Sequence, residues 1–390
     1  MYLTKEEEKA LEGEYGEAIA MAMRILVTLG EMNNAERLIK INSAHVSGIS
    51  YVNIGEEGLE FILKMAEAKV KVRTTCNPAC MDLERWRDLG ISEHIAEGQL
   101  RIAEALRDMN IEETFTCTPY FVGNRPSKDS HVSWGESSAV VFANTFLEAR
   151  TNREGGPSAL ASAIVGKTPL YGLHLEENRR PTVRVKIEYT PSSLCDYSMV
   201  GYIIGYRIQR GIPLVEGLKV QDEDQAKAFS AGLAAASNVS MAILKPQPQP
   251  LEVVEIDEKE VKEYYERFNI HEKPDLIFIG CPHCSLEELM YVDLLIKKPL
   301  KGVEFWMCTS RGVYMKAKRR GIIDSLESKG VKVLKDMCIV VTKIRDMGYE
   351  SVWTNSSKAA HYLKLLHGVK VRLCSIKSIV SSITKRANTP

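Results

Sequence analysis

The chain lacks a net charge, a long apolar run and an apolar leader. Its 51 Lys and Arg residues balance its 51 Asp and Glu residues, so no overall field attracts nucleic acid or an anionic membrane surface. The longest apolar stretches, 18–29 and 229–244, are broken by charged, polar or glycine residues before they reach membrane-spanning length. The first residues are rich in glutamate and do not form a signal segment. We therefore expect a cytoplasmic protein.

Only one segment has the composition of a linker. Residues 245–250 read Lys-Pro-Gln-Pro-Gln-Pro, and alternate prolines favour an extended conformation that continues neither a helix nor a central strand. At 390 residues with 45% hydrophobic content, the chain is long enough for two or more lobes. We predict an N-terminal part of one or more lobes over 1–244, a linker over 245–252 and a C-terminal lobe over 253–390.

The residues before the linker predict helices mixed with short strands. Thr4 and Glu7 have the spacing of a capping box, which starts a helix that should run to about Leu29. Further helices are expected over 57–68, 92–109, 139–149 and 222–235, and strands over 38–42, 46–52, 70–74, 113–117 and 183–189.

After the linker, strand-like runs alternate with helical segments. The runs lie at 276–280, 304–308, 331–334, 351–354 and 370–373. Such alternation is typical of a parallel sheet with helices on both faces. The sequence therefore predicts a multi-lobed α/β protein with parallel sheets flanked by helices.

Three of the nine cysteines end a strand-like run or lie in the turn beside it: Cys117, Cys281 and Cys338. Proteins of the α/β class bind ligands at such strand ends. Three converging thiolates would hold an iron–sulfur cluster and leave one iron free to act as a Lewis acid. This pattern indicates a hydro-lyase.

Other interpretations of the cysteines stay open. A free cysteine often packs as a small hydrophobic side chain, and the Cys281-x-x-Cys284 pattern is also that of a redox dithiol. A structural zinc site would need a second pair at close spacing. The odd cysteine count fits a reduced intracellular protein better than one with disulfides. Of the histidines, His283 stands out because it lies inside the cysteine turn.

Residues 118–153 are dense in polar side chains that have no evident surface role. An apolar helix is expected to follow Ser137 and Ser138, so its free N–H groups would lie beside Glu136 and Ser137. A helix N-terminus of this kind binds anions well. An ordinary serine N-cap is the alternative.

Seven motifs, in matching order over most of the chain, resemble those of the aconitase X family. They lie at 41–48, 75–78, 116–120, 136–140, 144–152, 171–174 and 280–283. The length is similar to that of the archaeal two-subunit form, in which a separate small subunit carries the swivelling domain. The resemblance implies an aconitase-like fold.

The resemblance also implies a dehydratase with an iron–sulfur cluster of the 4Fe–4S kind. The archaeal branch is implied to convert mevalonate 5-phosphate to trans-anhydromevalonate 5-phosphate in isoprenoid biosynthesis, and the bacterial branch to dehydrate cis-3-hydroxy-L-proline. The implied cluster ligands are Cys117, Cys281 and Cys338. The third ligand is the least determined, because relatives have Ser-Pro-His at 281–283, so Cys284 or Cys374 would be a substitute for Cys281.

The remaining implied roles concern substrate and partner. Glu136 and Ser137 are the catalytic candidates, with Glu136 either orienting the hydroxyl or shuttling a proton. The implied substrate-binding residues are Gly48, Asn77, Glu136, Ser137, Ser357 and Lys358.

By analogy with aconitase, the proton-abstracting base is a serine of the swivelling domain. We therefore expect an obligate heterodimer with a small subunit, a phosphorylated hydroxy-acid substrate, and neither nucleic acid nor membrane as a partner. The rival interpretation is a non-catalytic protein that binds a metabolite or a partner on an aconitase-like scaffold.

Overall fold

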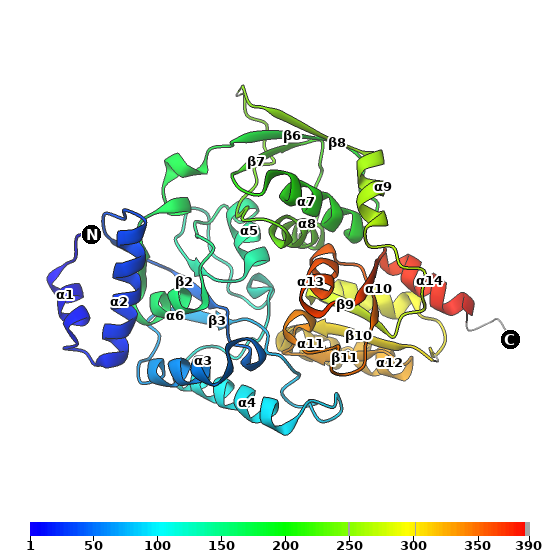
Figure 1. Cartoon of the computed structure of the whole chain (residues 1–390), viewed down its shortest axis with the longest axis horizontal. Helices are drawn as coiled ribbons and strands as arrows, with labels where there is room; N and C mark the ends of the chain where they lie inside the picture. The colour runs from blue at the N-terminus through cyan, green and yellow to red at the C-terminus, as the bar shows by residue number, and fades with distance from the viewer. Residues whose placement is uncertain (249, 301, 387–390) are drawn as a thin grey trace. The chain divides into compact units, whose positions relative to one another are not determined.

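The computed structural model describes residues 1–248, 250–300 and 302–386 (Figure 1). It divides the chain into two compact units, the first ending at Arg180 and the second beginning at Pro181. Both units contain parallel strands with helices packed on them, which confirms the predicted α/β class. The proline-rich residues around the predicted linker lie inside the second unit, and the domain boundary drawn there stays a prediction.

Two helices, not one, begin the first unit. Thr4 caps α1 (Lys5–Glu12) with the predicted capping box: the backbone N–H of Thr4 donates to Glu7 Oε2 at 2.8 Å. The helix ends at Gly13, whose φ of 92° is left-handed, and α2 (Glu17–Met32) starts after Gly16, where φ is 100°. The expected single helix is therefore wrong, because two glycines with positive φ interrupt it.

The central sheet of the first unit has three parallel strands in the order β3–β2–β4. These are β3 (Arg73–Cys76), β2 (Ser43–Val46) and β4 (Ser133–Trp134). A separate antiparallel pair joins β1 (Leu38–Lys40) to β5 (Lys167–Pro169). Because the three central strands run the same way, the residues after Val46, Cys76 and Trp134 emerge at the same edge.

Four helices complete the first unit. They are α3 (Tyr51–Met65), α4 (Glu93–Asp108), α5 (Ser137–Thr145) and α6 (Gly156–Val165). Leu59 and Ile62 of α3 pack with Ile102 and Leu106 of α4 and with Leu26 of α2 in one apolar core. The strand expected over 46–52 is absent from the described chain, because α3 already begins at Tyr51.

The strand expected over 113–117 is not formed in the described structure either. Phe115 adopts a positive φ of 37°, which lies outside the β region, and only an isolated bridge joins Glu112 to Thr75. The segment is an ordered loop beside β3: the N–H of Thr116 donates to the carbonyl oxygen of Cys76 at 2.9 Å.

The second unit begins with a small parallel sheet of order β7–β6–β8. Its strands are β7 (Pro213–Glu216), β6 (Val183–Glu188) and β8 (Val253–Asp257), and α9 (Glu258–Glu266) follows β8. Helices α7 (Leu194–Ile208) and α8 (Glu223–Ala235) pack backbone to backbone. A Cβ atom on Gly232 would lie 1.9 Å from the carbonyl oxygen of Ser198, so this contact requires glycine.

A five-stranded parallel sheet of order β11–β10–β9–β12–β13 forms the rest of the second unit. Its strands are β9 (Leu276–Cys284), β10 (Glu304–Thr309), β11 (Lys332–Lys335), β12 (Ser351–Thr354) and β13 (Lys370–Leu373). All five were predicted to within a few residues. Among the described residues of both units, no helix is long and apolar enough to cross a bilayer.

Helices lie on both faces of this sheet, as predicted (Figure 1). One apolar core packs the strands against four helices, while α13 (Ser357–His367) packs against α7 and α8. The four helices are α10 (Leu286–Leu295), α11 (Arg311–Arg319), α12 (Ile322–Ser328) and α14 (Ile376–Arg386).

Candidate active site

The predicted groups of the first unit gather at the carboxyl edge of its central sheet. Gly48 follows β2, Asn77 follows β3, and Glu136 and Ser137 follow β4. Sheet topology thus brings together residues that are up to about ninety positions apart, as the general rule for parallel sheets predicts.

Glu136 is the N-cap of α5. Its Oε1 accepts hydrogen bonds from the N–H and the hydroxyl of Ser138, at 3.2 and 2.8 Å. The carboxylate therefore satisfies part of the helix N-terminus that was expected to bind an anion, and the expected alternative of a serine cap is replaced by a glutamate cap. Glu136 is 8% exposed, so its charge lies close to the protein interior.

Asn77 connects to Glu136 directly. Its side-chain Nδ2 donates to Glu136 Oε2 at 3.0 Å, and its backbone N–H donates to the carbonyl oxygen of Val46 at 2.9 Å. These bonds fix the amide at the point where β2 and β3 both end. The structure therefore joins two of the predicted site residues by one hydrogen bond.

His45 is a member of this cluster that the sequence analysis did not single out. It is fully buried on β2, and its ring nitrogens lie 2.8 Å from Thr75 Oγ1 and 2.9 Å from Asn77 Oδ1. Burial lowers the pKa of His45 to about 4, although the Asn77 hydrogen bond and the charge of Glu136 act in the opposite direction. The imidazole is therefore neutral. Its place within the motif at 41–48 and one residue before the end of a buried strand was the available signal.

The loop at Gly48 is held between two other glycines. Gly48 has a φ of 69°, which favours glycine, while a Cβ on Gly135 would lie 2.5 Å from Ser47 Oγ and one on Gly156 would lie 2.6 Å from the Ser47 carbonyl oxygen. Gly135 immediately precedes Glu136. The close approach therefore fixes the Gly48 loop against the segment that carries the carboxylate.

Cys117 lies in the first unit, at the end of the loop that replaces the predicted strand. It is 7% exposed, and its neighbours Thr116 and Thr118 share a hydrogen bond between their hydroxyls at 3.0 Å. The thiol is thus carried by an ordered, buried turn.

Cys281 and Cys338 lie in the second unit, in two turns that are bonded to each other. Cys281 is in the last part of β9, and His283 Nε2 donates to the carbonyl oxygen of Met337, the residue before Cys338, at 2.8 Å. His283, which the sequence distinguished by its position inside the cysteine turn, therefore joins the two cysteine turns. Arg311 also fixes the second turn, because its guanidinium binds the fully buried Asp336 carboxylate at 2.5 and 3.2 Å.

The two substitutes for Cys281 lie in other surroundings. Cys284 belongs to the apolar core with Ile277 and Leu289. Cys374 lines a different cavity, and burial raises the pKa of its thiol to about 11. Cys281 lines a small cavity with Ser198, Asn355 and Ser356.

Ser357 and Lys358 begin α13, after its N-cap Ser356. The hydroxyl of Ser357 donates to the Ser198 carbonyl oxygen at 2.8 Å, and its N–H donates to Ser198 Oγ at 3.0 Å. Ser357 therefore ties α13 to α7, and Lys358 is 8% exposed beside it. Their predicted role in substrate binding stays a prediction.

Lys227 of α8 is a second group that the sequence analysis missed. Its ammonium is 2% exposed and binds Asp224 Oδ1 at 2.9 Å, the Glu288 carboxylate, and the carbonyl oxygen of His283 at 3.3 Å. Burial acts to lower the pKa of Lys227, but the charges of Glu288 and Asp224 outweigh it and raise that pKa. Lys227 is thus a buried cation beside the Cys281 turn. After the polar first turn of α8, Lys227 is the one charged residue among small and apolar residues, and this was the signal.

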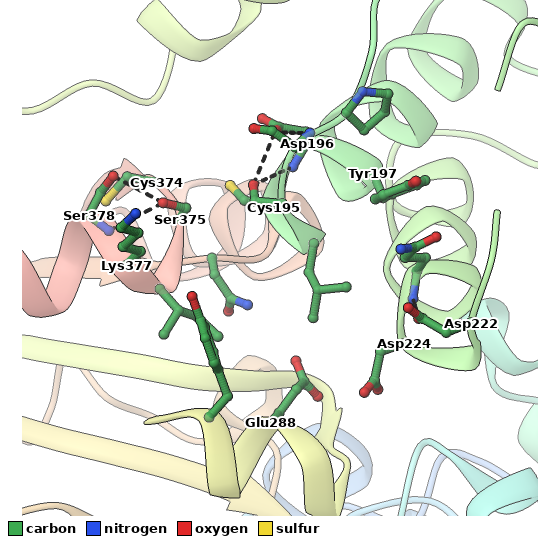
Figure 2. Close-up of a pocket in the computed structure, with 18 of the residues that line it drawn as sticks. Cys195, Asp196, Tyr197, Asp222, Asp224, Glu288, Cys374, Ser375, Lys377 and Ser378 are labelled. Carbon is green, nitrogen blue, oxygen red and sulfur yellow. Dashed lines mark hydrogen bonds between the residues drawn. The ribbon is translucent and has the colours of Figure 1, made fainter. Parts of the chain in front are cut away.

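A larger cavity of about 1090 Å³ adjoins this small cavity in the second unit. The two share Leu194, Glu288 and Asn355. Figure 2 shows Cys195 and Asp196 at the start of α7, with Cys374 and Ser375 on one side and Asp224 and Glu288 on another. Asp196 accepts hydrogen bonds from Ser192, Ser193 and Tyr265, so this carboxylate is already satisfied.

The predicted cluster ligands divide between the units, with Cys117 in the first and Cys281 and Cys338 in the second. In neither unit do the described residues gather three His, Cys, Asp or Glu side chains that could hold a metal ion. The donor chemistry still fits an iron–sulfur cluster, because thiols in ordered turns are the usual ligands of such clusters.

Comparison with known proteins agrees with this architecture over most of the chain. Models of the aconitase X first, second and third domains match residues 1–177, 181–266 and 274–385. The crystal structure of Thermococcus kodakaraensis aconitase X in its holo-form has a TM-score of 0.92 at 40% identity and covers 98% of this chain and 100% of that chain.

Two groups of relatives are similar in sequence. The phosphomevalonate dehydratase large subunit of Methanocaldococcus jannaschii is 46% identical over 383 residues, 93% of this chain and 95% of that protein. The cis-3-hydroxy-L-proline dehydratase of Pseudomonas aeruginosa is 30% identical over 401 residues, 96% of this chain but 69% of that protein. The chain belongs to the aconitase X family.

Proposed function

We propose that this chain is the large subunit of a hydro-lyase that dehydrates mevalonate 5-phosphate to trans-anhydromevalonate 5-phosphate. The full-length similarity to phosphomevalonate dehydratase large subunits supports the reaction. The observation in the structure that carries the proposal is the Asn77–Glu136 pair at the strand edge, which presents a carboxylate and an amide beside a helix N-terminus.

The proposed cofactor is an iron–sulfur cluster held by Cys117, Cys281 and Cys338. When bound, it supplies a Lewis acid that assists departure of a hydroxyl group. The second unit supports its two ligands through the His283–Met337 hydrogen bond.

Side chains of this chain would bind and orient the substrate. Glu136 accepts a hydrogen bond from the hydroxyl that leaves, while Asn77, Ser137 and the Gly48 loop surround that hydroxyl. Lys358 and Ser357 supply a positive charge and a helix N-terminus for an anionic group of the substrate. The proton α to the carboxylate is taken by a serine of the small subunit.

One co-production experiment tests the proposal. This chain is produced with and without its small subunit, reconstituted anaerobically and supplied with mevalonate 5-phosphate, and the product is followed by mass for the loss of one water. We expect turnover only when both chains are present. Robust turnover by this chain alone would contradict a base on the partner.

The same preparation separates the alternatives. Dehydration of cis-3-hydroxy-L-proline in place of mevalonate 5-phosphate would assign the chain to the second group of relatives. Tight binding of neither compound by isothermal titration, with a cluster present, would favour a non-catalytic role.

A further inference from the structure

A continuous chain of hydrogen bonds reaches Glu136 from the interior of the first unit. Asn124 Nδ2 donates to Thr75 Oγ1 at 2.8 Å, and Thr75 Oγ1 lies 2.8 Å from His45 Nδ1. His45 Nε2 lies 2.9 Å from Asn77 Oδ1, and Asn77 Nδ2 donates to Glu136 Oε2 at 3.0 Å. Every link lies within the first unit, across β2, β3 and the start of α5.

The direction in which these hydrogen bonds are donated follows from which atoms can carry a proton. An ionised carboxylate only accepts hydrogen bonds, so the Asn77 amide must turn its NH₂ group to Glu136 and its oxygen to His45. The Nε2 atom of His45 must then carry a proton and donate to that oxygen. Because the imidazole is neutral, Nδ1 is an acceptor, and the Thr75 hydroxyl must donate to it.

The opposite direction fits the geometry less well. It would require a protonated Glu136 that donates to Asn77, a reversed Asn77 amide, and a proton on His45 Nδ1. Thr75 would then have to donate to the carbonyl oxygen of Ala44, which lies at 3.5 Å, at the limit for a hydrogen bond. The observed distances therefore favour the direction in which each group donates toward Glu136.

We propose that His45 is a positioning residue that, through Asn77, holds Glu136 as an ionised hydrogen-bond acceptor, so that Glu136 orients the substrate hydroxyl and does not deliver a proton. This inference rests on the proposed function for the identity of the substrate group, but not for the hydrogen-bond chain. It decides between the two roles that the sequence left open for Glu136.

Packing alone does not account for His45. Its ring meets the Trp134 ring edge to face, with centroids 6.1 Å apart, and an apolar side chain of similar size would make the same contact. An apolar residue would, however, leave the oxygen of Asn77 without its donor and let the amide rotate. The orientation of the Asn77 amide therefore depends on a hydrogen-bond donor at the position of His45 Nε2.

The first test needs no substrate. The chain is labelled with 15N-histidine, and the His45 resonances are assigned by comparison with the spectrum of His45→Gln. At neutral pH we expect the neutral tautomer with the proton on Nε2. An Nδ1–H tautomer or an imidazolium would overturn the proposal, whether or not the chain proves to be a dehydratase.

The second test uses the two-subunit enzyme and a matched pair of variants. His45→Gln keeps an N–H near the Nε2 position, whereas His45→Leu removes it. We expect His45→Leu to lower kcat about 100-fold, since small misplacement near the reacting group has effects of this size, with little change in KM. Its activity should also fall off at a higher pH on the acid side, because the amide that donates to the carboxylate is no longer held in place.

His45→Gln should retain most of the activity and the original pH profile. Equal losses in both variants, or lower yields of folded protein with an unchanged pH profile, would show a structural role only and overturn the proposal. If His45→Leu does not fold, the tautomer measurement on the unaltered chain still decides.

Discussion

The two units hold their buried polar groups in different ways. Near Glu136 in the first unit, neutral donors follow one another in a line, from Asn124 through His45 to Asn77. Near Cys281 in the second unit, the polar groups form ion pairs, in which Lys227 binds both Asp224 and Glu288. A line of neutral groups has a direction and sets which atom carries a proton. An ion-pair cluster has no such direction, and it anchors the elements that it joins.

The largest effect is expected from replacing the cysteines of either unit that are proposed to bind the cluster. Cys117→Ser, Cys281→Ser and Cys338→Ser should each lose the cluster and all dehydratase activity. After anaerobic reconstitution, the parent should contain about four irons per chain and absorb broadly in the visible range. Cys284→Ala and Cys374→Ser are the controls that should keep their iron. Loss of iron from Cys374→Ser, with retention in Cys281→Ser, would move the third ligand to Cys374.

The next effect concerns the ion-pair cluster. Lys227→Met leaves the buried Glu288 carboxylate and the partly buried Asp224 carboxylate without their cation, so the free energy of unfolding of the second unit should fall by roughly 3–5 kcal/mol. Urea unfolding followed by the fluorescence of Trp306 and Trp353, in a background with the other tryptophans replaced, measures it. Lys259→Met is the control: the exposed Lys259–Glu263 pair should contribute less than about 1 kcal/mol. Equal effects would show that the buried cluster does not anchor the unit.

Acid should act on the first unit. The pKa of His45 is about 4 in the folded chain and about 6.5 when unfolded, so the unfolded chain binds more protons between these values. Stability should be complete above about pH 6.5 and fall by about 3 kcal/mol as the pH drops to about 4. The fluorescence of Trp86 and Trp134 reports this unit. His45→Gln should flatten the decline, and an unchanged slope would contradict a buried neutral His45.

The smallest effect should be the same in both units, because helix capping is local. Thr4→Ala removes the cap of α1, and Ser310→Ala removes that of α11, where Ser310 Oγ accepts from the Val313 N–H at 3.2 Å. Each should lower the free energy of unfolding by about 1 kcal/mol, while Thr4→Ser should have little effect. Thermal unfolding of the four proteins provides the measurement. A difference of several kcal/mol between the two caps would show that capping is coupled to tertiary structure.

The sequence predicted the large sheet of the second unit better than it predicted the first unit. The five strands of its large sheet are mostly buried and bounded by clear turns, and the pattern placed each within a few residues. In the first unit the strands are two to four residues long, too short for a periodic signal. Backbone conformations with positive φ break the first helix at Gly13 and Gly16 and prevent a strand at Phe115. The neighbouring residues in the sequence did not predict these conformations.

The candidate site divides in the same way. The family motifs contain Asn77, Glu136, Cys117 and Cys281, whereas Cys338 was named because it lies beside a strand-like run. His45 and Lys227 were missed because each acts through partners distant in the sequence: Asn77 lies 32 residues from His45 and Glu288 lies 61 from Lys227. A local sequence pattern does not show that residues so far apart in the sequence are in contact. Only the parallel pairing of β2 with β3, and the packing of α8 near β9, brings these groups into contact.

Glu136 both begins α5 and presents the carboxylate of the proposed reaction. A lineage that gave up catalysis would therefore still be selected to keep a capping residue at this position, and aspartate, serine, threonine or asparagine would meet that need. Each has a shorter side chain than glutamate and would reach less far toward Asn77. Under the proposed role, a descendant with another capping residue at 136 would be inactive, whereas retention of a polar residue there would not show activity.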